Sequence, residues 1–500
     1  MRSDQLSEGS PAGAAAPSGV RRGLGARLAG ESAVYGLGGM ANQAVAVMLV
    51  PIYARQLGDV GVGIMGVLNS TISLALMLAG LALPQAFFRW YLRESETLSE
   101  RSHILGTTLA IRIAASLLGF ALVLAAAVPL TAVLYGGEYL IVFALAAPIV
   151  LFDSLNTIPL SFLRAERRPR QYVMISLSRA VVGTVLIVAL VLVLQCGLIG
   201  VVIGSAVAAA LSATIGVAVL VQSGLARPRI DIPLSREMLA FTIPLVPATV
   251  ASWVLNLSDR PLLQVITGSA ATVGVYSLGY TAGLITNALV VQPFSLAWGA
   301  AYWEISRSAD APQSFARVLT WFLVFASGVA LFLSAIGTDA LRFLVGPEFD
   351  QSRFIVPFSA FAYVLYGAYT IGASGLSIVG RTRIVAAALG IAALTSLVLN
   401  LVLIPVLGMF GAAISTSIGY GVLAVLSGVL GQRHYPVPWQ LGRGVAIVIL
   451  AAALSAVALL GPDHAAWRVG CIIAYLPLLL ALRIVDLAQL RSVMSLVRRH

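Results

Sequence analysis

The chain is dominated by apolar runs of about 20 residues, separated by short breaks that are rich in charged residues, glycine or proline. A run of this length, folded as a helix, crosses the hydrocarbon core of a bilayer. Only 10% of the 500 residues are charged, against roughly 25% in an average soluble domain. The sequence therefore predicts an all-α polytopic membrane protein and excludes a soluble globular one.

Segmentation at the breaks predicts fourteen transmembrane helices. They are expected at residues 31–54, 61–88, 104–128, 139–163, 172–195, 198–222, 238–257, 272–298, 314–336, 354–379, 384–406, 410–430, 444–461 and 468–485. An even number of crossings places both ends of the chain on the same side of the membrane.

The positions of the arginines predict which side that is. All 31 basic residues are arginine, and basic residues beside a span favour the cytoplasmic side. Most of them fall in segments on the side of the chain ends, whereas the opposite side holds Arg55, Arg260, Arg342, Arg353 and Arg468. Both termini are therefore predicted to be cytoplasmic. The net charge of +11 is then explained by the arginines that orient the spans in the membrane, and no nucleic-acid partner is expected.

A weak internal repeat relates the two halves of the chain. Arg55-x-Leu57-Gly58 and Val62-Gly63-Ile64 close the first hairpin, and Arg260-x-Leu262, Gly268 and Val273-Gly274-Val275-Tyr276 close the turn before span eight. Internal repeats recur in secondary transporters. The repeat predicts two six-helix lobes related by a pseudo-two-fold axis, with two extra helices at the C-terminal end.

This reading divides the chain into six parts. A leader rich in Ser, Ala, Gly and Pro is expected to be disordered, and a C-terminal tail with apolar residues at helical spacing is expected to lie on the membrane as a basic amphipathic helix. The expected parts are a cytoplasmic leader at 1–30, a first lobe at 31–222, a cytoplasmic linker at 223–237, a second lobe at 238–430, two additional helices at 431–485 and the tail at 486–500.

Four motifs, most of them at hairpin turns, resemble those of one transporter family. They are Pro51-x-x-x-Arg55-x-Leu57-Gly58, Phe162-Leu163-Arg164-Ala165-Glu166-Arg167, Asp259-Arg260 before Gly274-Val275-Tyr276, and Asn400-x-x-x-Ile404-Pro405-x-x-Gly408-x-x-Gly411-Ala412-Ala413. In this order, over residues 31–430, the chain resembles the Wzx-type polysaccharide, or lipid-linked oligosaccharide, flippases. These belong to the multidrug/oligosaccharidyl-lipid/polysaccharide (MOP) exporter superfamily, and the last two spans fit its fourteen-helix members.

The resemblance implies a transporter for cell-surface polysaccharide biosynthesis in the bacterial inner membrane. It would flip a polyprenyl-pyrophosphate-linked oligosaccharide from the cytoplasmic to the outer leaflet by alternating access of the two lobes. Membrane lipids would surround it, and a polysaccharide polymerase and glycosyltransferases would act beside it. A cation-coupled multidrug or metabolite exporter of the same superfamily is the alternative, and a membrane polysaccharide polymerase or ligase or a non-transporting scaffold is a more distant one.

No catalytic site, metal site or cofactor is predicted, so the chain is not expected to be an enzyme. The histidines have no partner at the spacing that metal ligands require. They are His103, His434, His464 and His500. Cys196 and Cys471 are far apart in the sequence and form no disulfide framework.

Ionisable residues inside the spans are the candidate functional residues, because a charge near the bilayer centre costs about 2.5–3.5 kcal/mol even on the insertion scale. Arg112, Asp153 and Arg179 fall at similar depths in spans three, four and five, which predicts one cluster. The cluster either locks three helices together as an ion network or exposes an arginine that binds phosphate. Snorkelling to the interface is the third alternative.

A second set of candidates lies in the spans that the resemblance places around a central cavity. Arg89 is either an interfacial anchor or a residue at the mouth of the substrate path. Asp259 and Arg260 form either a hairpin cap or a pair at the cleft between the lobes. The amide side chains in spans one, two, seven and eight are candidate ligands for sugar hydroxyls or contacts between helices: Asn42, Gln43, Asn69, Asn256, Asn287 and Gln292.

The predicted topology is testable by cysteine labelling. In a variant that lacks Cys196 and Cys471, single replacements Arg168→Cys, Arg229→Cys and Glu348→Cys are treated with a membrane-impermeant maleimide outside intact cells. Because the arginine distribution places both termini inside, only position 348 is expected to react. Labelling at 168 and 229 before the cells are permeabilised would reverse the orientation.

Overall fold

The computed structural model describes residues 18–227 and 229–485, with side chains from Met48 onward except at residues 300, 338, 340 and 341. Every regular element in these residues is a helix. Twelve described helical stretches are long and apolar enough to cross a membrane. The other two predicted spans correspond to α1 (Ser18–Gly80) before Gly58 and to the shorter α19 (Ala465–Ala481). The predicted all-α polytopic fold is confirmed.

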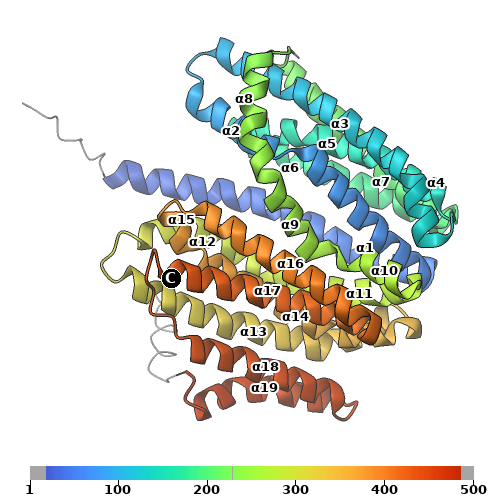
Figure 1. Ribbon diagram of the computed structural model, residues 1–500, viewed down its shortest axis with the longest axis vertical. Helices are drawn as coiled ribbons and strands as arrows, with labels where there is room; N and C mark the ends of the chain where they lie inside the picture. The colour runs from blue at the N-terminus through green and yellow to red at the C-terminus, as the bar shows by residue number, and fades with distance from the viewer. Residues whose placement is uncertain (1–17, 228, 486–500) are drawn as a thin grey trace, which may run out of the picture.

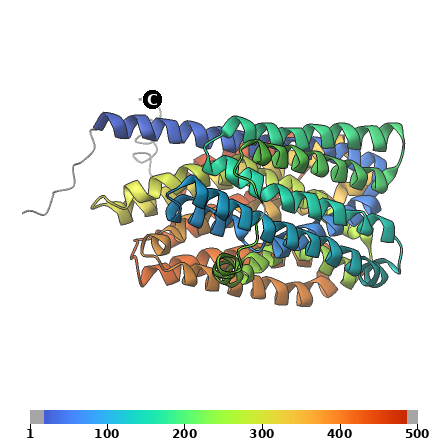
Figure 2. The ribbon, with the colours of Figure 1, turned by 90° about the horizontal axis from the view of Figure 1, so that it is seen from above.

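The helices lie side by side along a common direction and form two groups, with the first part of α1 between them (Figures 1 and 2). The first group, which we call the first lobe, contains α1, α2 (Leu83–Arg89), η1 (Trp90–Glu94), α3 (Leu98–Tyr135), α4 (Leu140–Ala144), α5 (Ala146–Ala165), α6 (Pro169–Val188), η2 (Ala189–Val193) and α7 (Gly197–Gln222). The start of α1 and the end of α19 lie at one end of the bundle (Figure 1). We call it the terminal end and the opposite one the far end.

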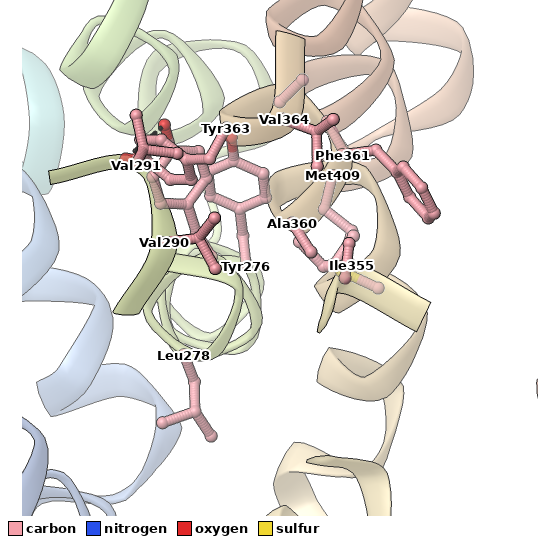
Figure 3. Packing of buried hydrophobic residues seen from close by; sticks show 14 of the residues in the cluster. Tyr276, Leu278, Val290, Val291, Ile355, Ala360, Phe361, Tyr363, Val364 and Met409 are labelled. Carbon is pink, nitrogen blue, oxygen red and sulfur yellow. Dashed lines mark hydrogen bonds between the residues drawn. The ribbon is translucent and has the colours of Figure 1, made fainter. Parts of the chain in front are cut away.

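The second lobe follows the predicted spans seven to twelve, with short helical breaks inside several of them. Its elements are α8 (Ile232–Thr242), η3 (Ile243–Leu245), α9 (Val246–Leu257), α10 (Asp259–Thr267), α11 (Ala270–Thr286), η4 (Asn287–Val291), α12 (Gln292–Ile305), α13 (Ala311–Leu344), η5 (Pro347–Phe354), α14 (Val356–Gly372), α15 (Ser374–Ile378), α16 (Thr382–Leu407) and α17 (Met409–Gln432). Its core is apolar and tyrosine-rich: Tyr276 of α11 lies near Tyr363 of α14, whereas Leu278 points away from α14 on the other side of α11 (Figure 3).

Two boundaries differ from the sequence expectation. α1 begins at Ser18, inside the segment expected to be a disordered leader, while residues 1–17 lie outside the described residues. α8 begins at Ile232, inside the expected linker. The predicted tail at 486–500 also lies outside the described residues.

The first hairpin turns at a single glycine. Gly58 has φ 66° and ψ −174° within otherwise helical α1, a conformation that residues with a Cβ rarely adopt. Asp59 and Val60 resume the helix immediately. The repeat motif that predicted this turn therefore marks the place where span one becomes span two.

Span seven connects the two lobes. α8 lies beside α2 and α3 of the first lobe, whereas α9 packs against α16 of the second (Figure 1). The change of direction occurs at η3, where Pro244 and Pro247 each remove a backbone donor. One helical span is therefore attached to both lobes.

The segment before α8 is fixed to the first lobe. Ser102 of α3 donates a hydrogen bond to the carbonyl oxygen of Leu225 at 2.9 Å, and His103 contacts Asp231 at 2.7 Å. The Asp231 carboxylate also accepts from the amide of Leu234 and so caps α8. That backbone hydrogen bond holds the pKa of Asp231 below its usual range, and the contact with His103 lowers the pKa further.

The two additional helices, α18 (Leu441–Leu460) and α19, are joined to the second lobe at the far end. Arg468, which is 4% exposed, pairs with Asp339 and Asp463. Arg342 of α13 donates to Asp350 and Asp463 at 2.7 Å each. This ion network connects the turn between α18 and α19 with α13 and η5.

Candidate functional site

Span two is interrupted in the membrane by a short non-helical step. α1 ends at Gly80, and α2 begins at Leu83. Between them, Leu81 and Ala82 have φ of 46° and 50°, which is strained for residues with a Cβ. A step of this kind frees the last carbonyl groups of the preceding helix.

Arg112 satisfies those carbonyl groups. Its guanidinium donates to the carbonyl oxygens of Ala79 and Gly80 at 3.1 Å each and to the hydroxyl of Ser154 at 3.2 Å. The residue is 1% exposed. A cation at a helix C-terminus is also favoured by the helix dipole. Arg112 therefore holds the break in span two, a role that the sequence did not predict.

Asp153 pairs with Arg179 alone. The Arg179 guanidinium donates from Nε to the carboxylate at 2.7 Å and from Nη2 to its second oxygen, which gives a bidentate pair between α5 and α6. The predicted cluster of three is thus wrong in its geometry, because Arg112 turns toward the break in span two. The Arg179 side chain is 36% exposed and that of Asp153 18% exposed, so this pair is accessible.

In the second lobe, Asp259 and Arg260 lie inside a buried polar network. Asp259 is 1% exposed, accepts from the Tyr276 hydroxyl and contacts Arg260 at 3.0 Å. The Arg260 guanidinium also donates to the carbonyl oxygen of Asn256 at 3.1 Å and lies 4.6 Å from the ring centre of Tyr280. The pair is buried and connects α9 and α10 with α11, and the Arg260 side chain lies beside Gly66 of α1.

Further tyrosines extend this network across the lobe. The Tyr363 hydroxyl donates to that of Tyr280 at 3.3 Å, and the Tyr420 hydroxyl donates to the side-chain oxygen of Asn256. Tyr280, Tyr363 and Tyr420 were not among the predicted site residues. The available signal was the four-residue spacing of Tyr276 and Tyr280, which places both on one helix face.

The predicted amide ligands are dispersed. Asn69 is exposed, and Gln292 and Asn287 are half-buried. Asn256 is engaged by Tyr420. The side chains of Asn42 and Gln43 lie outside the described residues.

Arg89 lies at the terminal end of the first lobe. Its guanidinium is 4.8 Å from the ring centre of Trp90 and 5.0 Å from that of Phe241, and it pairs with Glu94 at 3.1 Å. Phe241 belongs to α8, so this arginine contacts the helix that connects the lobes.

The two lobes touch in the middle of the bundle through α1 and α9. The Ser70 hydroxyl donates to the carbonyl oxygen of Leu257 at 2.7 Å, and the Trp253 indole donates to the carbonyl oxygen of Ser70 at 2.9 Å. Neither Ser70 nor Trp253 was a predicted site residue, and nothing in the sequence pattern distinguishes them.

At the far end, the two copies of the repeat motif meet each other. A Cβ at Gly63 would collide with the carbonyl oxygen of Ala270, and a Cβ at Gly274 would collide with that of Asp59. Each glycine thus packs against the residue four positions before the other. The contact obeys the pseudo-two-fold relation of the motif and brings α1 and α11 together at their backbones.

Polar contacts of Arg55 and Gln264 lie at the same end of the bundle as these two glycines. Arg55 donates to the carbonyl oxygens of Leu344 at 3.1 Å and Phe343 at 3.2 Å, at the end of α13. Gln264 of α10 donates to the carbonyl oxygen of Leu134, at the end of α3, at 3.1 Å. We call the contacts of Gly63, Gly274, Arg55 and Gln264 the far-end seal.

Within the described residues, no three His, Cys, Asp or Glu side chains gather as a metal ion would require. An accessible ion pair, hydroxyl groups and amides suit a polar, phosphate-bearing or sugar-bearing ligand.

Comparison with known proteins agrees with this architecture. A family model described as "Polysaccharide biosynthesis protein" matches residues 28–298, and no curated protein sequence matches the chain. The structure is similar to that of the lipid II flippase MurJ in an inward closed conformation, with 16% identity, a TM-score of 0.68 and coverage of 88% of this chain and 95% of that one.

Two transporter structures are also similar. An inward-facing multidrug resistance MATE family transporter of the MOP superfamily has 14% identity and a TM-score of 0.62, covering 78% of this chain and 94% of that one. An outward-facing MATE family transporter has 13% identity and a TM-score of 0.51, covering 81% of this chain and 95% of that one. At these identities the likeness shows the fold, which is the one that the MurJ and MATE structures share.

We predict that Arg112→Ala strongly lowers the stability of the protein. The change leaves two carbonyl groups at the span-two break without donors, at a cost of about 1–3 kcal/mol for each buried group. The expected result is a marked loss of folded protein in detergent, measured by size-exclusion chromatography and a thermal unfolding midpoint. Unchanged folding would show that Arg112 does not hold the break.

A double-mutant cycle separates this role from that of Arg179. Arg179→Ala leaves the Asp153 carboxylate without its partner, so adding Asp153→Asn is expected to restore folded abundance. The same Asp153→Asn change is expected to leave the Arg112→Ala defect in place, because Arg112 does not contact the carboxylate. Rescue of Arg112→Ala by Asp153→Asn would contradict the assignment.

Proposed function

Because the chain belongs to the polysaccharide biosynthesis protein family, we propose that it flips a polyprenyl-pyrophosphate-linked oligosaccharide across the bacterial inner membrane. The lipid-linked glycan moves from the cytoplasmic to the outer leaflet and supplies cell-surface polysaccharide biosynthesis. A polysaccharide polymerase and glycosyltransferases act with it in that pathway. The family match over residues 28–298 carries this proposal.

In this proposal the terminal end of the bundle is cytoplasmic. The arginine distribution supports that orientation. The far-end seal then closes the outer side of the protein, and transport requires the lobes to separate at Gly63 and Gly274. Alternating access of this kind is a rigid-body movement of one helical repeat against the other.

The accessible polar residues are assigned to the substrate path. Arg89 and Arg179 supply guanidinium groups, and Asn69, Asn256 and Gln292 supply amides for sugar hydroxyls. Asn42 remains a predicted member of this set. The buried Arg112, Arg260 and Asp259 support the path by fixing helices within each lobe, and they do not contact the substrate in this conformation. Asp153 orients Arg179.

The membrane potential suffices to drive this step. Moving about two negative charges outward across 100 mV, negative inside, releases roughly 4.6 kcal/mol. Diphosphate export therefore does not require a coupling ion.

The proposal predicts that deleting the protein abolishes a surface glycan and leaves lipid-linked repeat units on the cytoplasmic face. Extraction of the lipid-linked pool and glycan staining of the cell surface measure both effects. A normal surface glycan in the deletion strain, with no second flippase in the genome, would reject the function.

The far-end seal predicts a separate effect of Gly63→Leu. The new side chain collides with the Ala270 carbonyl group, so the outer side should stay open and transport should fall by about tenfold or more. Ser277 of α11 lies beside Gly66 of α1. A reporter cysteine in place of Ser277 should become reactive to an impermeant maleimide. Gly390→Leu is the control, because a Cβ there meets no atom within 4 Å. If Gly63→Leu transports as the wild type does and its reporter cysteine stays unreactive, the far-end seal does not close the outer side.

A further inference from the structure

The cytoplasmic end of the first lobe carries a set of arginines stacked on aromatic rings. Among the described residues, every arginine–ring contact at the terminal end lies here. The distances from guanidinium carbon to ring centre are 4.8 Å for Arg89 over Trp90, 5.0 Å for Arg89 over Phe241, 5.5 Å for Arg101 over Tyr91, 5.2 Å for Arg164 over Phe88 and 6.0 Å for Arg168 over Phe162. We call these residues, together with Arg93 from the same segment as Arg89, the arginine–aromatic rim.

The rings of the rim support one another. Phe87 stacks on Tyr91 with ring centres 4.8 Å apart and meets Phe88 at 5.9 Å, and Tyr91 meets Phe162 edge to face at 6.1 Å. Phe87, Tyr91 and Phe162 are fully buried. The platform beneath the guanidinium groups is therefore rigid, and the arginines lose less side-chain entropy when a ligand binds.

Acidic residues neutralise the rim only in part. Glu94 pairs with Arg89 at 3.1 Å, and Glu166 lies 3.8 Å from Arg101. Among the described residues, Arg93, Arg164 and Arg168 have no ion pair, and all three are exposed. The rim thus retains positive charge with free N–H donors.

A hollow opens beside the rim where α8 passes α2. Its volume is about 530 Å³, and Arg89, Arg93, Glu94 and Phe241 line it. Two guanidinium groups from one short segment face the same space. Arg89 lies over the rings of Trp90 and Phe241 and donates its Nε–H to Glu94, so its other N–H groups and those of Arg93 remain available for the oxygens of a phosphate group.

Orientation of the protein alone does not account for the stacking. The positive-inside rule requires arginines at the cytoplasmic end but no aromatic partner for them. Arg381 and Arg383, exposed at the same end of the second lobe, have no ring contact or ion pair among the described residues. The rim is therefore a feature of one lobe.

We propose that the arginine–aromatic rim is a binding site for a phosphate-bearing lipid headgroup at the cytoplasmic surface. The inference rests on the proposed function for its orientation and for the lipid that passes through the protein. The phosphate belongs either to the transported lipid or to an anionic phospholipid of the same leaflet. Contact with Phe241 places the site on the helix that connects the two lobes.

The test uses the full chain in phosphatidylcholine nanodiscs, with inorganic pyrophosphate as the probe in isothermal titration calorimetry. Arg93→Gln and Arg164→Gln are each expected to weaken pyrophosphate binding about tenfold. Phe241→Leu keeps the charge but removes one of the two ring contacts of Arg89, and a smaller loss, about threefold, is expected. Arg381→Gln and Arg383→Gln are the matched controls and should bind as the parent protein does.

Equal losses in rim and control variants would show attraction to charge alone and would overturn the proposal, as would the absence of saturable binding. Adding phosphatidylglycerol to the nanodiscs distinguishes the two sources. If phosphatidylglycerol weakens the binding of pyrophosphate, the site takes a phospholipid headgroup. If pyrophosphate binds as tightly as before, the phosphate of the transported lipid is the ligand. Both results support a phosphate site. Because binding is measured without transport, a normal surface glycan in the deletion strain would reject the proposed function and leave this result intact.

Discussion

The structure depends on the absence of water inside a bilayer. Any backbone group that a helix leaves unpaired there must find a partner within the protein. The break in span two creates such groups, and the buried guanidinium of Arg112 supplies the donors. The break also sets the direction of α2, which carries Arg89 to the terminal end. One buried arginine in the third span thus determines where an exposed arginine of the second span lies.

The polar groups of each lobe are satisfied mainly within that lobe. Asp259 and Arg260 are surrounded by tyrosines of the second lobe, and Asp153 and Arg179 pair within the first. The lobes instead meet through close backbone approach at Gly63 and Gly274 and through a few hydrogen bonds. Small residues allow such approach without binding two helices permanently by charge. This arrangement suits two bodies that move against each other.

Span seven makes the two lobes unequal despite their repeat. Its first half is attached to the first lobe through Asp231 and Phe241, and its second half belongs to the second lobe. A movement between the lobes must therefore bend this span, and the prolines at η3 lower the cost by removing backbone hydrogen bonds. The arginine–aromatic rim contacts the attached half through Phe241, so a bound headgroup would lie beside the span that bends.

The sequence by itself determined the all-helical membrane fold and the position of the first hairpin turn, because these follow from the length and polarity of continuous segments. It also identified the ionisable residues inside the spans, since each is costly there. Only the tertiary structure decided which of them meet. Successive residues rotate by about 100° around a helix, so the rotation of span three about its axis decides whether Arg112 faces Asp153 or, as the structure has it, the carbonyl groups of Ala79 and Gly80. Partner choice among distant helices depends on that rotation, which hydropathy does not encode.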